Sequence, residues 1–288
     1  MTILVTGGNG QLGCALRLAS AESRHRYIFT DIEELDITSS TAIEAFFNRE
    51  KVDVVVNCAA YTAVDLAEEN EAKADEINHK AVALLAKACK QHNATLIHIS
   101  TDYIFSGNAD KPYNEIAEPA PLNAYGRTKL AGERAIAESG CKSIILRTSW
   151  LYSEFGKNFV KTMRNLTATR SEIKVVADQI GTPTYAGDLA KAITYIIESG
   201  QSEKVGVYHY SNMGECSWYE FAVEIARLSG NLSCKINPCT TADYPTKANR
   251  PRYSVLDKSK IKEVFGIEIP QWKESLEHCI AELEKYNA

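Results

Sequence analysis

Thr6-Gly-Gly-Asn-Gly-Gln-Leu-Gly13 is the stretch that decides the fold of this chain. A β-rich run over residues 2–6 leads into it, and a helical pattern over residues 11–21 follows. A strand, a glycine-rich loop and a helix in this order form the unit that binds a dinucleotide through its pyrophosphate. The spacing is G-x-x-G-x-x-G rather than the stricter G-x-G-x-x-G, so the prediction depends on the flanking strand and helix.

Three of the glycines in this loop recur at intervals of three: Gly7, Gly10 and Gly13. They permit a tight turn, a close approach of the backbone to a pyrophosphate, and dense packing of the helix. The N-terminus of the helix then faces the anion. The residues that we expect to contact the cofactor here are Gly7, Gly10, Gln11, Leu12 and Gly13.

An acidic residue ends the second predicted strand. The run over residues 26–30 is followed by Asp31, whose carboxylate would accept from the adenosine ribose hydroxyls and repel a 2'-phosphate. This position favours NADH over NADPH. Asp36, with Ile37 beside it, is a second candidate for this end of the cofactor, and a lysine or arginine from elsewhere could admit NADPH.

The first half of the chain alternates strand and helix patterns. Strand patterns cover residues 2–6, 26–30, 52–57, 95–100 and 143–148, and helical patterns cover residues 11–21, 40–50, 70–91 and 123–139. Nearly continuous apolar strands between helices are typical of a parallel sheet covered on both faces. We predict an α/β fold with a Rossmann-like, doubly wound parallel sheet that binds ligands at the carboxyl ends of its strands.

The pattern changes after about residue 150, where polar loops separate shorter elements. Helical patterns cover residues 157–168, 187–199, 217–229, 257–265 and 271–286, strand patterns cover residues 173–177 and 206–211, and residues 237–252 look irregular. We predict a dinucleotide-binding domain over residues 1–150. Residues 151–288 are predicted to form a smaller lobe that is interleaved with the sheet and binds the substrate.

Tyr125 and Lys129 lie four residues apart in a helical pattern, and therefore on one face of the helix. An ammonium beside a phenol favours the phenolate, so the pair can pass a proton to or from a substrate oxygen. This spacing also arises by chance in many helices. The glycine-rich loop and Ser100-Thr-Asp102, at the end of a predicted strand, are two further features of a dinucleotide-dependent active site.

Longer motifs accompany these features. They are Asn57-Cys-Ala-Ala-Tyr-Thr-Ala-Val-Asp65, Ser100-Thr-Asp-Tyr-Ile-Phe105, Tyr125-Gly-Arg-Thr-Lys-Leu-Ala-Gly-Glu133, Arg147-Thr-Ser-Trp150, Asp178-Gln-Ile-Gly-Thr-Pro-Thr184 and Arg250-Pro-Arg-Tyr-Ser-Val-Leu-Asp257. Over nearly the whole chain the sequence resembles the extended short-chain dehydrogenase/reductases, and among them the reductases that complete dTDP-L-rhamnose synthesis. The resemblance implies that NADPH or NADH reduces the 4-keto group of dTDP-4-dehydro-L-rhamnose.

Reduction of a ketone requires hydride delivery to carbon and protonation of the developing alkoxide. We assign Tyr125 as the general acid, with Lys129 lowering its pKa and binding the nicotinamide ribose. Thr101 would donate to the same oxygen. The resemblance implies that Asp102 contacts sugar hydroxyls, and Trp150 offers a flat apolar face for the deoxysugar.

Other residues are expected around the cofactor and the nucleotide. The residues that follow the third strand, and would line the ribose and pyrophosphate, are Ala60, Tyr61 and Thr62. Asn78 would order a water or the loop beneath the site. Arg250 or Arg252 would clasp the nucleotide diphosphate, because a guanidinium pairs bidentately with phosphate oxygens. The alternative for these two residues is an arginine-rich surface loop.

Two other functions remain open. A nucleotide-sugar epimerase or dehydratase shares the Tyr and Lys but retains its cofactor through the cycle, and a dehydratase would carry an Asp-Glu pair after Thr101, where this chain has Asp102-Tyr103. The same fold also serves as the non-catalytic regulatory subunit of methionine adenosyltransferase. An intact Thr101, Tyr125 and Lys129 argue against that role.

The composition excludes several classes of partner. The 288 residues carry a net charge of −5 without a basic block, so no nucleic-acid partner is expected. No apolar run is long enough for a membrane span and no signal-peptide pattern precedes the first strand, so we expect a cytoplasmic protein.

No metal site is indicated by the eight cysteines and six histidines, which show no ligand spacing. Some members of the resembling group form a magnesium-bridged dimer through a glutamate just beyond the glycine motif. This chain has Ala15 there, so a metal-bridged dimer is not expected, although a homodimer stays possible.

Overall fold

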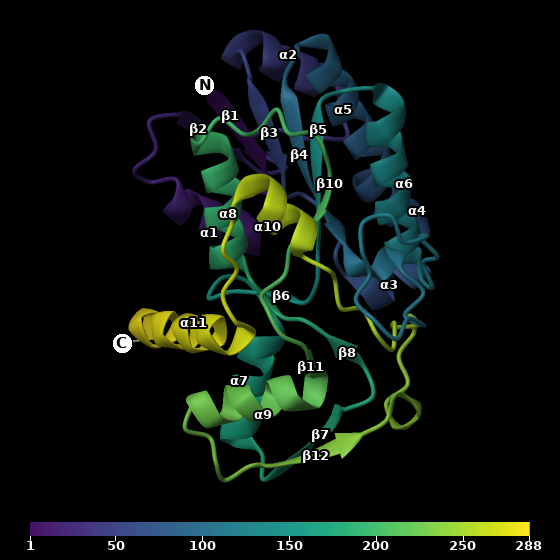
Figure 1. Cartoon of the computed structure of the whole chain (residues 1–288), viewed down its shortest axis with the longest axis vertical. Coiled ribbons are helices and arrows are strands. Elements are labelled where there is room, and N and C mark those ends of the chain that lie inside the picture. Colours follow the sequence, from purple (N-terminus) through teal and green to yellow (C-terminus); the bar gives the residue numbers. More distant parts are fainter. Residues whose placement is uncertain (288) are drawn as a thin grey trace.

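A six-stranded parallel sheet forms the upper part of the molecule in Figure 1, in the strand order β10-β5-β4-β3-β1-β2. The computed structural model describes residues 1–287. The strands are β1 (Thr2–Thr6), β2 (Arg26–Thr30), β3 (Val54–Asn57), β4 (Thr95–Thr101), β5 (Ser143–Thr148) and β10 (Gly206–His209). The chain order reverses between β1 and β3, and the carboxyl ends of strands at such a switch point form the crevice where ligands bind.

Helices cover both faces of this sheet, as the apolar strands predict. Side chains alternate between the faces along β1: Ile3 and Val5 pack in one cluster, and Leu4 packs in the other. The first cluster contains α1 (Gln11–Ala19) and α8 (Ala186–Glu198). The second contains α2 (Ser40–Glu50), α5 (Ala81–Gln91) and Ile136 of α6 (Ala124–Ser139).

The second half of the chain contributes to both parts of the molecule. β10 pairs with β5, and α8 and α10 (Ser259–Phe265) pack in the core of the sheet. The remaining elements form the lower lobe in Figure 1. They are α7 (Phe159–Thr169), α9 (Trp218–Leu228), α11 (Trp272–Asn287) and the strand pairs β7 (Glu172–Val176) with β12 (Lys235–Cys239), β8 (Ile180–Gly181) with β11 (Cys216–Ser217), and β6 (Leu151–Tyr152) with β9 (Thr184–Tyr185).

The largest differences from the prediction lie in two segments. The expected helix over residues 70–91 is divided into α4 (Glu71–Asp75), a π-helical turn (Glu76–Lys80) and α5, and α3 (Val64–Glu69) precedes it. The π turn places Asn78 in the core, where its side chain binds the main chain of Tyr61. The segment expected to be irregular, residues 237–252, instead begins inside β12, which contains Pro238 and, within the described residues, pairs with β7 alone.

Among the described residues, no helix has both the length and the apolar character that a membrane crossing needs.

Candidate active site

A cleft of about 570 Å³ opens at the carboxyl ends of the strands, between the sheet and the lower lobe. Its lining includes Thr101, Asp102, Tyr125, Lys129 and Trp150. A second cavity of about 400 Å³ shares Gly7, Gly10, Cys58 and Ala60 with the cleft and extends to Asp31, Asp36 and Ile37. The two cavities thus meet at the glycine-rich loop, as expected for a dinucleotide that spans both.

The glycine-rich loop is too tightly packed for side chains at two positions. Gly7 has a φ of +64°, and a Cβ there would lie 2.7 Å from the Ala59 nitrogen. A Cβ on Gly13 would lie 2.4 Å from the Gly7 carbonyl oxygen. Gln11 also joins the loop to the second half of the chain, because its Oε1 accepts from Ser153 and Asn158. Leu12 and Gly13 line the cleft beside it.

Acidic and basic side chains both line the second cavity. Asp31 follows β2, and its Oδ2 accepts from the Asn9 amide at 3.2 Å, which ties it to the glycine-rich loop. Hydrogen bonds from Thr38 hold the pKa of Asp36 below its usual value. Lys73 of α4 lines the same cavity and is paired with Glu76 at 2.9 Å. The sequence allowed for a distant cation here without identifying it.

The expected Tyr and Lys both reach the cleft from α6. The Asn123 side chain caps this helix by accepting from the Gly126 amide at 2.8 Å, which starts the helix just before Tyr125. Tyr125 is 9% exposed and Lys129 is 1% exposed. The Lys129 ammonium donates to the Ile99 carbonyl at 2.6 Å, and this bond fixes it against β4.

Burial sets the protonation of this pair. It raises the pKa of Tyr125 to about 12, although a hydrogen bond with Thr101 acts in the opposite direction. It lowers the pKa of Lys129 to about 8. The lowering of the Tyr125 pKa that the helix spacing predicts is therefore not seen, because desolvation of the phenolate is the larger effect. A phenol that keeps its proton at neutral pH suits a proton donor.

Thr101 and Asp102 form a second polar group in the cleft. The Thr101 hydroxyl donates to Asp102 Oδ1 at 3.2 Å, and burial raises the pKa of Asp102 to about 6. Asp102 is 2% exposed, and its Oδ2 makes no close hydrogen bond among the described residues, although the Ser254 side chain acts to lower the pKa of this carboxyl. A buried, unsatisfied carboxylate oxygen that lines a cleft fits a ligand hydroxyl.

Trp150 belongs to an aromatic wall that the sequence did not reveal in full. It stacks on Trp218 with ring centroids 3.6 Å apart, and both rings line the cleft. Its backbone has a φ of +48°, in the left-handed region. A Cβ on Gly181 would lie 2.6 Å from the indole, so the glycine leaves space for the ring. Trp218 begins α9 after the capping residue Ser217, and no sequence pattern links it to Trp150.

Some of the expected residues lie away from the two cavities. Ala60 and Thr62 line the cleft, whereas Tyr61 is held by main-chain hydrogen bonds to Asn78 and does not line it. Asn78 therefore orders the loop beneath the site, which was one of its two expected roles. The Asn78 amide nitrogen also donates to Thr128 of α6 at 3.1 Å.

Neither Arg250 nor Arg252 lines the cleft. Arg250 is paired with Asp65 of α3, with Nη2 and Oδ2 2.7 Å apart. The sequence could not show that Asp65 lies beside Arg250, so the pairing of this guanidinium was not foreseen. A diphosphate would have to replace this carboxylate.

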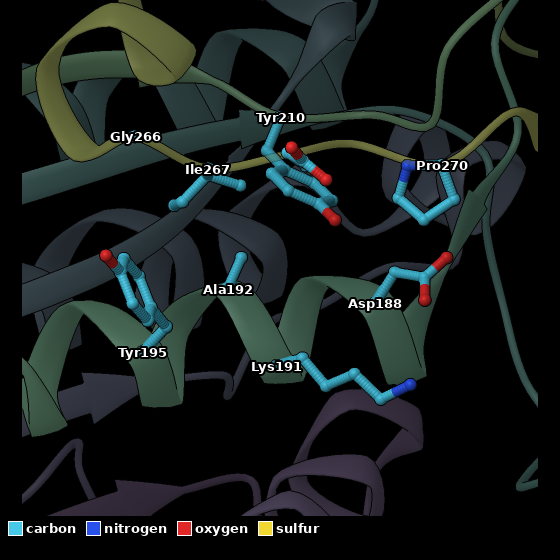
Figure 2. Close-up of a pocket in the computed structure, with 9 residues that line it drawn as sticks. Asp188, Lys191, Ala192, Tyr195, Tyr210, Gly266, Ile267 and Pro270 are labelled. Carbon is cyan, nitrogen blue, oxygen red and sulfur yellow. The ribbon is translucent and has the colours of Figure 1, made fainter.

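A smaller cavity of about 340 Å³ lies between α8 and the segment 266–270 (Figure 2). It contains none of the expected site residues. Its one buried carboxylate, Asp188, accepts from Asn212 at 2.8 Å and from Ser275, which joins α8 to α11. We assign these contacts to the packing of the lobe on the sheet.

The described residues contain no cluster of histidine, cysteine and carboxylate side chains that could hold a metal ion.

A glycine-rich loop at the switch point of a parallel sheet, with Thr101, Tyr125 and Lys129 beside it, defines a class of protein: a nicotinamide-dependent oxidoreductase with the short-chain dehydrogenase/reductase fold. More narrowly, the chain belongs to the family described as RmlD substrate binding domain, whose model matches residues 1–285.

Several relatives of this chain share the name dTDP-4-dehydrorhamnose reductase. The chain is 41% identical to the dTDP-4-dehydrorhamnose reductase of Aggregatibacter actinomycetemcomitans, over 98% of this chain and 99% of the relative. A dTDP-4-dehydrorhamnose reductase structure from Clostridium acetobutylicum is 45% identical, with a TM-score of 0.94 over 99% of this chain and 100% of that one. Another, from Bacillus anthracis in complex with NADP, is 39% identical, with a TM-score of 0.93 over 98% and 99% of the two chains.

Proposed function

We propose that this protein reduces the 4-keto group of dTDP-4-dehydro-L-rhamnose with NADPH or NADH and releases dTDP-L-rhamnose. The observation that carries the proposal is the cleft, whose lining combines Thr101, Tyr125 and Lys129 with the glycine-rich loop and Trp150. The bound cofactor would supply hydride to the carbonyl carbon. The protein's own groups then have to orient the ketone and protonate its oxygen.

Tyr125 is the proton donor in this reaction. Its phenol keeps its proton at neutral pH because its pKa is raised to about 12, and an alkoxide is a stronger base than a phenolate. The Lys129 ammonium stabilises the phenolate that remains after the transfer. Thr101 is a second donor to the same oxygen. Its hydroxyl would have to turn away from Asp102, to which it donates in this structure.

The remaining contacts are proposed for the sugar nucleotide. Asp102 Oδ2 would accept from a sugar hydroxyl, and the Trp150–Trp218 stack would lie against the apolar side of the deoxysugar. The lobe that follows residue 150 would hold the nucleotide, with Arg250 exchanging Asp65 for a diphosphate oxygen. We expect a cytoplasmic enzyme that acts on a small-molecule substrate.

The proposal is tested by the stoichiometry of cofactor oxidation. Purified protein is given NADH or NADPH with dTDP-4-dehydro-L-rhamnose, and we expect one equivalent of cofactor to be oxidised per sugar. An epimerase or dehydratase would leave the bulk cofactor unchanged. Oxidation with a different 4-keto nucleotide sugar alone would reassign the substrate, and none with any sugar would favour a regulatory subunit.

Opposite charges at the adenosine end should set the cofactor preference. Asp31→Asn removes the charge that repels a 2'-phosphate and keeps an acceptor for Asn9, so we expect the ratio of kcat/KM for NADPH to that for NADH to rise about tenfold. Lys73→Ala should lower kcat/KM for NADPH about tenfold and leave NADH unchanged. Lys80→Ala, which removes an exposed lysine paired with Asp75, is the control. An unchanged ratio in Asp31→Asn would place the ribose elsewhere, with Asp36 as the next candidate.

Loss of the Trp150 ring should weaken sugar binding. Trp150→Ala is expected to raise KM for the sugar by an amount equivalent to about 1–3 kcal/mol, with a smaller effect on KM for the cofactor. Gly181→Ala should raise KM for the sugar by a smaller amount, since its methyl group displaces the indole without removing it. Turnover that is insensitive to both changes would place the sugar away from this wall.

A further inference from the structure

Four buried polar side chains form a chain behind the cleft, from α6 into the sheet. Lys129 Nζ lies 3.3 Å from His98 Nε2, and His98 Nδ1 lies 3.0 Å from Asn57 Nδ2. The Thr6 hydroxyl donates to Asn57 Oδ1 at 2.6 Å. All four residues are at most 1% exposed. Because these groups are removed from solvent, their hydrogen bonds have to be satisfied within the chain.

The donor or acceptor role of each member depends on its neighbour. Neutral His98 has one ring nitrogen that donates and one that accepts. When the Asn57 amide nitrogen faces Nδ1, it donates to Nδ1, so the ring proton is on Nε2. Lys129 can then accept a hydrogen bond from Nε2 only if it is a neutral amine. When the amide is turned over, its oxygen accepts from Nδ1, and the bare Nε2 accepts from the Lys129 ammonium. The Thr6 hydroxyl fits both arrangements because it can donate or accept.

We propose that His98 is a positioning residue for Lys129: it accepts a hydrogen bond from the ammonium, and it changes tautomer together with the Asn57 amide when Lys129 loses its proton. The proposal rests on the proposed function, in which the ammonium assists proton transfer by Tyr125. A bond from the ammonium is charge-assisted and stronger than the alternative bond to a neutral amine. His98 therefore stabilises the charged form of Lys129.

The other groups around Lys129 decide the direction of the expected change. They are the Ile99 carbonyl on β4, Cys58 after β3, and Tyr125 and Glu133 on α6. Burial lowers the pKa of Lys129 to about 8, while Glu133 and Cys58 act in the opposite direction. The ammonium is thus lost as the pH rises through about 8. Removing the His98 acceptor should move this loss to lower pH.

The pH dependence of kcat tests this proposal with two substitutions at one position. His98→Leu removes the acceptor and should shift the alkaline limb of the profile by about one unit to lower pH. His98→Gln offers a carbonyl oxygen in place of Nε2 and should return the limb towards that of the wild type. His209→Leu is the control, because His209 is equally buried on β10 but has other partners: its Nδ1 donates to the Tyr113 carbonyl and its Nε2 accepts from Arg147. Coincident limbs for His98→Leu and wild type, or equal shifts for both His98 variants, would overturn the proposal.

The wild-type protein provides a second test that does not depend on a variant's folding. ¹⁵N NMR of the His98 ring should show the proton on Nδ1 below the pKa of Lys129 and on Nε2 above it. One unchanged tautomer throughout the titration would contradict the proposal. This measurement uses no substrate, so its failure is distinct from failure of the proposed function, which would appear as an absence of sugar-dependent cofactor oxidation by the wild type.

Discussion

Tyr125→Phe should lower kcat by roughly 10²-fold or more while the protein stays folded. The substitution removes the proton that the alkoxide receives and retains the ring, which packs among Ala67, Ala74 and Ala124 and meets Tyr103 edge-on at 5.7 Å. Steady-state kinetics with saturating NADH and sugar would measure the effect. The circular dichroism spectrum would establish that the fold is retained.

Tyr113→Phe is the matched control for this prediction. Tyr113 is also buried, but it stacks on Phe105 outside the cleft, and its hydroxyl accepts from the Ala109 amide. The Tyr113→Phe substitution should therefore leave kcat nearly unchanged. Wild-type turnover by Tyr125→Phe would exclude Tyr125 as the proton donor. Lys129→Met should also impair turnover, and it should weaken cofactor binding as well.

Glu133→Ala should cause a large loss of stability, about 3–5 kcal/mol in the free energy of unfolding. Glu133 of α6 pairs with Arg147 of β5 at 2.7 Å, and both side chains are 6% exposed. Removal of the carboxylate leaves a buried guanidinium without its counter-charge. The same pair fixes α6, with Tyr125 and Lys129, against the sheet. Denaturant unfolding followed by circular dichroism would measure the loss.

A second ion pair on α6 provides the comparison. Arg127 and Glu71 are 3.0 Å apart, but their side chains are 45% and 48% exposed. Solvent screens this pair, so Glu71→Ala should change stability by less than about 1 kcal/mol. Similar small losses in both variants would show that burial of the Glu133–Arg147 pair does not govern its contribution.

Local sequence patterns were sufficient to predict the sheet and the glycine-rich loop at its switch point. β1 and β2 have the predicted bounds, because an apolar run next to a glycine loop or an acidic turn has few other ways to fold. The start of α6 follows from the capping side chain of Asn123. The spacing of Tyr125 and Lys129 then places both on the cleft side of that helix.

Contacts between distant segments could not be predicted in this way. Trp218 meets Trp150, and Asp65 meets Arg250, only because the lobe folds back on the sheet. Neither pair has a spacing that a periodic pattern could reveal. The sequence was also misleading on the pKa of Tyr125, since the helix spacing shows the nearby cation but not the burial that raises this pKa.

Transfer of deuterium from the cofactor to the sugar is the most direct test of the central claim. The wild-type protein would be supplied with NADH or NADPH deuterated at the transferable position of the nicotinamide, together with dTDP-4-dehydro-L-rhamnose. NMR and mass spectrometry of the product should show one deuterium on carbon 4 of the sugar for each cofactor oxidised. A product without deuterium at that carbon, or recovery of the ketone with its cofactor still reduced, would contradict the account.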